Sequence, residues 1–387
     1  MLSLLAGALL VATLAGCGSD AGSDGSGTSS KGADATSATD DPIVIGLVDE
    51  KTGPTAAVQG AAGDGVRLAV ETINDAGGIG GRQIELLERD SAGEAATAIS
   101  GINEMVDEGA VAIVGPVNGG LCQAVAPTYA ELEVPGFCLS PVDLPKETSY
   151  MYGIGVELAQ EDEILFDQLG AQNGTFGIIA QKTPVLDLVK SHVERFAGDA
   201  DVKIEAVETT DTSARTQIER LIGEGIGGLL LAPCGPLSVT AAKEAIDLGF
   251  EGPIVVWNCF ASAGAAKQMA PITNGNIYTV APTFILGDAT DDDPQKAAID
   301  AYEAAGGPAD IVAAAGWDGM QALAGAIEEG GATSKEIQDT LEGGYSYIGV
   351  WSMGEISAHD HRGVSTDGAL RLVRFTPEGT MEPVDSL

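Results

Sequence analysis

Side chains that could catalyse a reaction or bind a metal ion are sparse in this sequence. It contains three histidines, and neither a G-x-S-x-G nucleophile turn nor an H-E-x-x-H zinc motif occurs. His359 and His361, separated by Asp360, have an alternating spacing that could chelate a metal ion. The stretch around them is polar and lies near the C-terminus, which favours a solvated turn. We therefore predict a protein that is not an enzyme and has no metal site and no cofactor.

The first of the five cysteines follows an apolar run. Residues 2–14 are too few to span a bilayer and are followed by two small residues, a pattern typical of an export signal. The sequence Leu14-Ala15-Gly16-Cys17 resembles the bacterial lipobox, in which the cysteine is diacylated and becomes the new N-terminus after cleavage. We expect residues 1–16 to be a lipoprotein signal peptide. Lipidation of Cys17 would then anchor the protein to the outer face of the cell membrane.

Residues 17–41 hold that cysteine and a segment that cannot form a core. From Gly18 to Asp41 the chain contains only Gly, Ser, Thr, Ala, Asp and one Lys, so it has no branched aliphatic or aromatic side chain to bury. A flexible Gly-rich chain of this length spans about 27 Å as an r.m.s. distance. We predict a flexible tether that holds a folded domain clear of the lipid surface.

The chain is strongly acidic. Its 387 residues include 57 acidic and 19 basic side chains, a formal charge of −38. Residues 1–41 contain five aspartates and one lysine, a net −4, which leaves −34 for the rest of the chain. Such a surface repels phosphate backbones and anionic lipid headgroups, so nucleic acid and polybasic docking to membranes are excluded.

Strand and helix patterns alternate after the tether, which is typical of βαβ units and parallel sheets. One helix is predicted over residues 58–76, with Val66, Ala69 and Ile73 on one apolar stripe and glycines at its end. The pattern predicts an α/β fold with two blocks, one on either side of about residue 158. The predicted strands are apolar runs at 43–48, 83–88, 111–114, 136–139, 177–180, 203–208, 228–232 and 254–257.

The four cysteines after Cys17 are an even number, as expected for disulfides in an exported protein, and three pairings are open. Cys122 begins the helix after one predicted strand and Cys138 ends the next strand. Cys234 and Cys259 stand at the carboxyl ends of two successive strands. These ends are adjacent in a right-handed βαβ unit, so Cys122–Cys138 and Cys234–Cys259 are the predicted pairs. A zinc site is the alternative, but there is no C-x-x-C pair and the histidines are distant in sequence.

Several runs of the folded part carry a resemblance that covers nearly everything after the tether. The runs are Ile45-Gly46-Leu47, Thr52-Gly53-Pro54, residues 69–82, residues 111–116, Val125-Ala126-Pro127, Val134-Pro135, Ser140-Pro141, Gly249 before the strand at 254, and Gly316-Trp317-Asp318. They resemble the Leu/Ile/Val-binding (branched-chain amino acid) family of type I periplasmic binding proteins. The resemblance implies two doubly wound parallel-sheet lobes joined by three crossovers, which close over a small polar ligand and hand it to an ABC permease without catalysis.

The lobe boundaries are expected at the crossovers, near residues 158, 282 and 345. Residues 43–157 and 283–345 would form the N-terminal lobe. Residues 158–282 and 346–387 would form the C-terminal lobe.

Ligands of open parallel sheets bind beyond the carboxyl ends of strands, where helix N-termini present backbone amides. In the first lobe, the turn with Asn118, Gly119 and Gly120 follows such a strand end. The family usually shows a Ser pair where Asn118 and Gly119 stand, so backbone groups would carry more of the binding. A plain helix-capping turn is the alternative. A second turn offers Val142 and Asp143, where the aspartate could meet a cationic group or form a local cap.

In the second lobe, three strand ends supply further ligand candidates, namely Thr183 with Pro184, Cys234 and Asn258. The family commonly carries an acidic residue at the third position, and an α-ammonium buried without a carboxylate is costly. An amino acid would therefore need Asp143, Asp49 or Glu50 as a counter-charge. The solute could instead be neutral or anionic, such as an amide or a small carboxylic acid.

Aromatic side chains near the predicted cleft could form a stacking wall. Any single tryptophan at a strand end could equally belong to the hinge or the core. The candidates are Trp317, which we include among the ligand-binding residues, with Tyr152, Phe260 and Trp257.

These observations predict a monomeric, extracytoplasmic solute-binding lipoprotein of an ABC importer. Its partners would be the small-molecule solute and a membrane permease. A ligand-sensing receptor module on the same fold is the alternative.

Overall fold

The structure, a computed structural model, describes residues 41–387 apart from 142–143, 145–149, 173, 288 and 366–369. The predicted signal peptide, Cys17 and nearly all of the tether lie outside the described residues, as do Val142 and Asp143. Residues Asp40–Leu387 cluster as one compact unit. Within the described residues, no helix combines the length and apolar character needed to cross a bilayer.

The first sheet has five parallel strands in the order β2-β1-β3-β4-β5. Strand β1 is central, with Ile45 opposite both Leu86 and Ala112, and is buried along nearly its whole length. Burial on both faces explains its almost continuous apolar run. The strands are β1 (Ile43–Asp49), β2 (Ile84–Asp90), β3 (Ala112–Val114), β4 (Gly136–Cys138) and β5 (Met151–Gly153).

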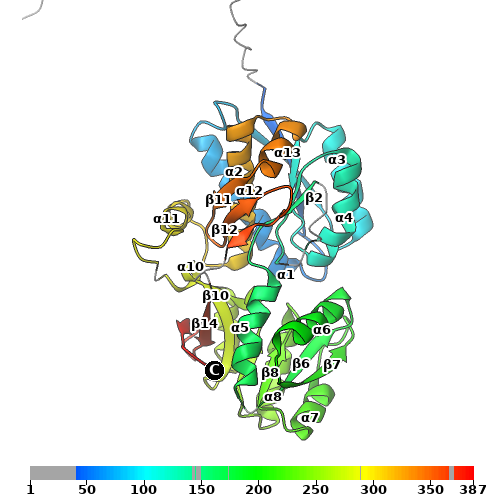
Figure 1. The fold of residues 1–387 in the computed structure, drawn as a ribbon, viewed down its shortest axis with the longest axis vertical. Helices are drawn as coiled ribbons and strands as arrows, with labels where there is room; N and C mark the ends of the chain where they lie inside the picture. Colours follow the sequence, from blue (N-terminus) through cyan, green and yellow to red (C-terminus); the bar gives the residue numbers. More distant parts are fainter. Residues whose placement is uncertain (1–40, 142–143, 145–149, 173, 288, 366–369) are drawn as a thin grey trace, which may run out of the picture. The chain divides into compact units, whose positions relative to one another are not determined.

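Helices cover both faces of this sheet (Figure 1). On one face, α2 (Ala61–Asp75) and α12 (Ile311–Gly330) pack against Ile45 and Leu47 of β1. On the other, α3 (Ala95–Asp107) and α4 (Gly119–Leu132) pack against Val48 and Ile113. The helix predicted over residues 58–76 is divided at Gly60 into α1 (Ala56–Gln59) and α2.

The helices α2 and α12 approach each other closely at two glycines. A Cβ atom on Gly65 would lie 1.9 Å from the carbonyl oxygen of Ala313, and one on Gly316 would lie 1.9 Å from that of Ala62. The backbones of α2 and α12 are therefore in direct contact at this crossing. The contact matters for the site because the first turn of α12 reaches the pocket described below.

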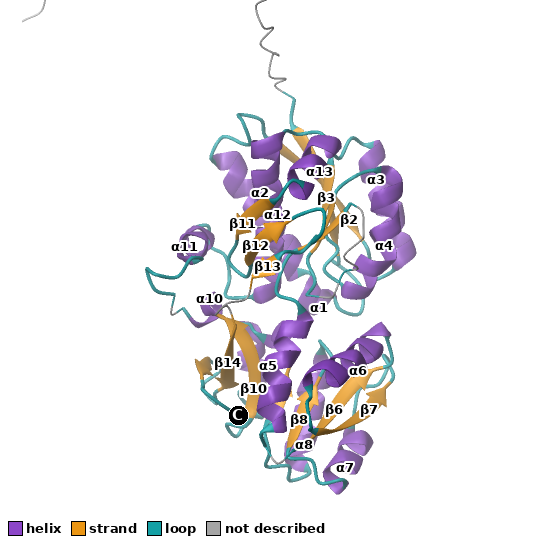
Figure 2. Cartoon of the chain, viewed as in Figure 1, coloured by secondary structure: helices purple, strands orange, loops and turns teal. Residues whose placement is uncertain are grey.

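The second sheet has seven strands in the order β15-β14-β10-β9-β8-β6-β7 (Figure 2). Five of them are parallel, and β14 and β15 add an antiparallel edge. The strands are β6 (Thr175–Gln181), β7 (Asp201–Val207), β8 (Gly228–Leu231), β9 (Ile254–Val256), β10 (Ile277–Pro282), β14 (Leu370–Phe375) and β15 (Met381–Pro383).

The second sheet is also covered on both faces. One cluster joins Ile178 and Leu230 to Phe166 of α5 (Leu158–Gly170) and to α6 (Pro184–Phe196). The other joins Ile179 and Leu231 to α7 (Arg215–Gly223), α8 (Pro236–Asp247) and α9 (Ala263–Met269). Each sheet therefore has its own two-faced core, as the family's two-lobed architecture implies.

The chain passes from the first sheet to the second between β5 and α5, and leaves the second sheet after β10 through α10 (Thr283–Leu286). It returns to the first lobe, where α12 packs on α2. The remaining elements of this return are α11 (Lys296–Ala304), α13 (Ser334–Glu342) and a small antiparallel sheet of β11 (Tyr345–Ile348), β12 (Met353–Ile356) and β13 (Val364–Ser365).

This small sheet corrects the boundary expected near residue 345. Its strand β11 packs on α12 and α13, and the loop after β11 reaches the end of the first sheet, where Gly155 N donates to Ser352 Oγ at 3.1 Å. His361 Nδ1 lies 3.0 Å from the carbonyl oxygen of Met151. Residues 346–365 therefore pack with the first lobe, and the chain rejoins the second sheet only at β14.

Candidate functional site

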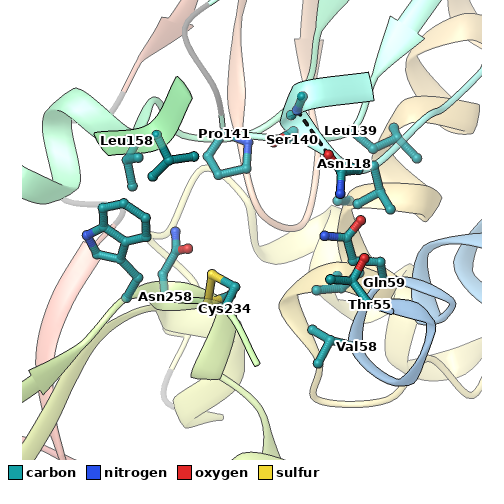
Figure 3. A pocket seen from close by; sticks show the side chains of 18 of the residues that line it. Thr55, Val58, Gln59, Asn118, Leu139, Ser140, Pro141, Leu158, Cys234 and Asn258 are labelled. Carbon is teal, nitrogen blue, oxygen red and sulfur yellow. Dashed lines mark hydrogen bonds between the residues drawn. A yellow bond between two sulfur atoms is a disulfide. The ribbon is translucent and has the colours of Figure 1, made fainter. Parts of the chain in front are cut away.

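A pocket of about 430 Å³ lies beyond the carboxyl ends of strands from both sheets (Figure 3). Loops after β3 and β4 form its first-lobe wall, and loops after β6, β8 and β9 form its second-lobe wall. The first turn of α12 and the loop after β11 also reach it. This is the place where parallel sheets present helix N-termini to ligands.

On the first-lobe wall, Asn118, Gly119 and Gly120 line the pocket, at the start of α4. The Oδ1 atom of Asn118 accepts the backbone N–H of Gly120 at 3.0 Å and that of Leu121 at 3.3 Å. Asn118 is therefore a helix cap as well as a lining residue, and its oxygen is occupied by the turn. Ser140 and Pro141 line the same wall, whereas Val142 and Asp143, which follow them, lie outside the described residues.

On the second-lobe wall, Thr183, Cys234 and Asn258 line the pocket. Thr183 caps α6, because its Oγ accepts the backbone N–H of Val185 at 3.3 Å. Pro184 is the first residue of α6, and its side chain lies outside the described part of the structure, so its predicted contact with the ligand stays a prediction.

Two disulfides link the loops that form the walls. Cys122 is bonded to Cys138 and Cys234 to Cys259, with Cα separations of 5.7 and 5.9 Å. These are the pairs expected from adjacent strand ends. The first joins the start of α4 to the end of β4, and the second joins the loops after β8 and β9. In each lobe, one disulfide therefore links two of the segments that follow adjacent strands at the pocket.

Two buried acids of α5 accept hydrogen bonds from Asn258 and from its neighbour Trp257. The backbone N–H of Asn258 donates to Glu161 Oε1 at 2.6 Å, and Glu161 is fully buried. Burial, with the neighbouring charge of Asp162, raises the pKa of Glu161 well above its usual range. Asp162 accepts from Trp257 Nε1 at 2.9 Å and lies 2.8 Å from His192 Nδ1. This network was not predicted from the sequence, although two adjacent acids in a helix after a crossover were a signal for it.

The tryptophan in the site differs from the one predicted. Trp317 does not line the pocket, is 3% exposed and packs edge-on against Tyr302 at 5.4 Å. Trp351 lines the pocket instead, together with Trp257. Neither Tyr152 nor Phe260 is among the lining residues. Trp317 was wrongly selected because its position on α12 faces the core of the first lobe.

Asp318, one residue further along α12, positions the loop that carries Trp351. Its carboxylate accepts the backbone N–H groups of Val350 at 2.7 Å, Trp351 at 2.8 Å and Ser352 at 3.3 Å. Burial raises the pKa of Asp318 to about 7, while these three donors act in the opposite direction. A side chain of the long helix thus holds one wall of the pocket.

The acids Asp49 and Glu50, considered as counter-charges for an ammonium group, bond to other residues of the first lobe. Asp49 accepts from Arg67 Nη1 at 3.0 Å, and Glu50 accepts from the Thr55 hydroxyl at 2.6 Å. Neither is among the residues that line the pocket. They organise the turn after β1 and the start of α2.

The histidines near the C-terminus do not form a metal site in the described part of the chain, where no three His, Cys, Asp or Glu side chains are grouped to hold an ion. His359 is exposed, as expected of a solvated turn. His361 is buried and its ring lies 4.6 Å from that of Tyr152. The expectation of a solvated turn was therefore wrong for His361.

Two α/β lobes with a pocket at facing strand ends define a class of two-lobed solute-binding proteins. The chain belongs to the periplasmic binding protein family, whose family profile matches residues 42–380. Members of this family bind ligands and are not enzymes. The resemblance of the quoted sequence runs is confirmed by this match.

Relatives and solved structures agree with the assignment. The chain is 26% identical over 300 residues to the Leu/Ile/Val-binding protein BraC3 of Rhizobium johnstonii, covering 75% of this chain and 80% of that one. It is 26% identical over 312 residues to the leucine-, isoleucine-, valine-, threonine- and alanine-binding protein of Pseudomonas aeruginosa, covering 76% and 80%.

Among solved structures, the fold is similar to the branched-chain amino acid transporter substrate binding protein LivJ from Streptococcus pneumoniae in complex with isoleucine. The TM-score is 0.75 at 24% identity, with 88% of this chain and 98% of that chain covered. An extracellular ligand-binding receptor from Rhodopseudomonas palustris HaA2 gives a TM-score of 0.78 at 17% identity, covering 89% and 99%.

Proposed function

We propose that this protein is the extracytoplasmic solute-binding component of an ABC importer and that it binds a small solute with an aliphatic group. The observation that carries the proposal is the composition of the pocket. Both lobes contribute branched aliphatic side chains to it, which are Val58, Val117, Leu139, Leu158, Val185, Leu188, Ile311 and Val312. A volume of about 430 Å³ is within the range of small-molecule sites.

The names of the relatives suggest which solutes to test first. BraC3 is named for leucine, isoleucine and valine, and the Pseudomonas aeruginosa relative for these and two smaller amino acids. A branched aliphatic group suits the lining, because its burial contributes about 0.8 kcal/mol per methylene. The candidates are branched-chain or other amino acids, their amides, and small carboxylic acids.

Ligand binding would act through the arrangement of the two lobes. A solute held by Asn118 and Ser140 on one wall and by Thr183 and Asn258 on the other favours conformations in which both walls contact it. Three chain crossovers would serve as the hinges. The permease would then recognise the closed form.

The location of the protein follows from its N-terminal sequence. Lipidation at Cys17 would anchor it to the outer face of the cell membrane, and the tether would let the folded part reach a permease. We expect it to act as a monomer.

A thermal-shift screen tests the proposal. Purified protein from Asp40 onward, the compact unit of the structure, is heated with amino acids, amides and small acids that share aliphatic groups. A solute that binds only the folded state raises the melting temperature. If every compound leaves the melting temperature unchanged, the proposed function is contradicted.

A further inference from the structure

The described lining of the pocket has no charged side chain, although the chain is strongly acidic. Among the described residues, none that lines the pocket is Asp, Glu, Lys, Arg or His, whereas the whole chain has a formal charge of −38. Its polar groups are hydroxyls and amides. They belong to Thr55, Gln59, Asn118, Gln123, Ser140, Gln181, Thr183 and Asn258, with the indole of Trp351 and Trp257.

One of these amides has a donor with no partner. Asn258 is 4% exposed, and its Nδ2 atom is buried without a hydrogen-bond partner. Its backbone N–H is held by Glu161, and its side chain projects into the pocket between Leu158 and Cys234 (Figure 3). A buried N–H without an acceptor costs free energy, so this group favours a solute that brings an oxygen atom to it.

A cationic head group has no counter-charge on the described walls. The nearest acids behind Asn258 are Glu161 and Asp162, which are fully buried and absent from the lining. Glu161 Oε1 accepts from the backbone of Asn258 and Asp162 Oδ1 accepts from Trp257 Nε1, whereas Glu161 Oε2 is buried without a hydrogen-bond partner. Within the described lining, an ammonium group would lose its water shell without contacting a carboxylate, which is strongly unfavourable.

An anionic head group is no better matched. No Lys, Arg or His belongs to the described lining, and cap side chains accept N–H groups of the first turn in three helices near the pocket, although α8 has no side-chain cap. Asn118 caps α4, Thr183 caps α6, and Asp310 caps α12 through Val312 N at 2.8 Å.

We propose that the pocket selects an uncharged carboxamide with a branched aliphatic group, whose carbonyl oxygen accepts a hydrogen bond from Asn258 Nδ2. The aliphatic part would contact Leu139, Leu158 and Val185, and the amide N–H₂ would donate to the lining Gln and Thr oxygens. This inference rests on the proposed function and deepens it, because it names the head group of the solute.

Calorimetric titration with four compounds of matched aliphatic shape tests the inference. The probes are 3-methylbutanamide, 3-methylbutanoate, 3-methylbutylamine and leucine, which differ in the charge of the head group. We expect the amide to bind at least about tenfold more tightly than each of the others. If leucine or another charged probe binds more tightly, this inference is overturned while the proposed function stands. If none of the four probes binds, this inference and the proposed binding of a solute with an aliphatic group are both contradicted.

Variants of Asn258 test the predicted contact. Asn258→Asp keeps the shape, removes the donor and adds a carboxylate, so amide binding should weaken at least about tenfold and binding of the amine should improve. Asn103→Asp, which adds the same charge at an exposed position on α3, is the matched control and should bind like the wild type.

A second variant covers the case in which a new acid beside Glu161 and Asp162 prevents folding. Asn258→Ala removes the donor without adding charge, and it should weaken binding of the amide at least about tenfold. Wild-type affinity for the amide in a folded Asn258→Ala protein would overturn the inference. Folding is checked by circular dichroism.

Discussion

The carboxylate of Asp318 accepts the backbone N–H of Trp351 at 2.8 Å, which joins the middle of α12 to a tryptophan of the pocket wall. The two residues come from different parts of the first lobe, and the bond is fully buried. Gly349 packs directly on the carboxylate, where a Cβ atom would lie 2.4 Å from Oδ2. The position of Trp351 therefore depends on a buried acid that never contacts the pocket.

The pKa of Asp318 makes this support sensitive to pH. Burial raises that pKa from 3.8 to about 7 in the folded protein. Between these values the folded state holds a proton that the unfolded chain has lost, so the contribution of Asp318 to the free energy of unfolding falls as the pH rises. We expect the stability of the wild type relative to Asp318→Asn to fall by about 3 kcal/mol from about pH 5 to pH 8.

Urea unfolding at both pH values measures this difference. Asp75→Asn, at an exposed position on α2, shows how much of the response comes from removing any carboxylate. If the difference in the free energy of unfolding between the wild type and Asp318→Asn does not change with pH, the prediction is contradicted.

The placement of the three tryptophans gives an optical prediction. Trp257 and Trp351 line the pocket, and Trp317 lies in the core. A bound solute should therefore change the fluorescence emission of Trp257 and Trp351 but not that of Trp317. Trp257→Phe and Trp351→Phe should each remove part of the solute-dependent change, and Trp317→Phe should retain it. Loss of the change in Trp317→Phe alone would show that the pocket is misassigned.

Much of the sheet architecture could be predicted from the sequence because buried parallel strands form conspicuous apolar runs. All eight runs predicted as strands overlap strands of the structure, from β1 to β9 with β5 excepted. Most missed strands are short or depend on distant partners, whereas β10 is a buried run of six residues that could have been predicted. Strand β5 has three residues, and β14 is defined by antiparallel pairing with β10, far away in sequence. Periodicity cannot reveal either.

The site was predictable only where it depends on strand ends. Asn118, Thr183, Cys234 and Asn258 follow strands directly, and all four line the pocket. Trp351 does not follow a strand of either large sheet. Its place depends on a loop that folds around Asp318, and that contact between distant residues leaves no periodic pattern in the sequence.

The close crossing of α2 and α12 should be intolerant of a methyl group. Gly316→Ala would place a Cβ 1.9 Å from the carbonyl oxygen of Ala62, and rigid backbone on both sides limits relaxation. We expect a loss of about 3 kcal/mol in the free energy of unfolding. Gly223→Ala in α7, where nothing lies within 4 Å, is the matched control and should be neutral or slightly stabilising. Equal effects of the two substitutions on urea unfolding would contradict this account.

The two disulfides should contribute similarly to stability but differently to binding. They close segments of 16 and 25 residues, so chain entropy predicts that each stabilises the protein by about 3 kcal/mol. Cys234 and Cys259 line the pocket, whereas Cys122 and Cys138 are fully buried behind it.

Replacing Cys234 and Cys259 by Ala frees two loops that must stay together to present Asn258 and Pro233 to the solute. Ordering them again on binding costs free energy, so affinity for any solute identified in the thermal-shift screen should fall about tenfold. The matched variant lacking Cys122 and Cys138 should lose similar stability and less affinity, since its cross-link lies behind the wall. Calorimetric titration of both variants, well below their melting temperatures, separates the two effects. Equal losses of affinity would mean that the Cys234–Cys259 bond acts only through global stability and does not preorganise the site.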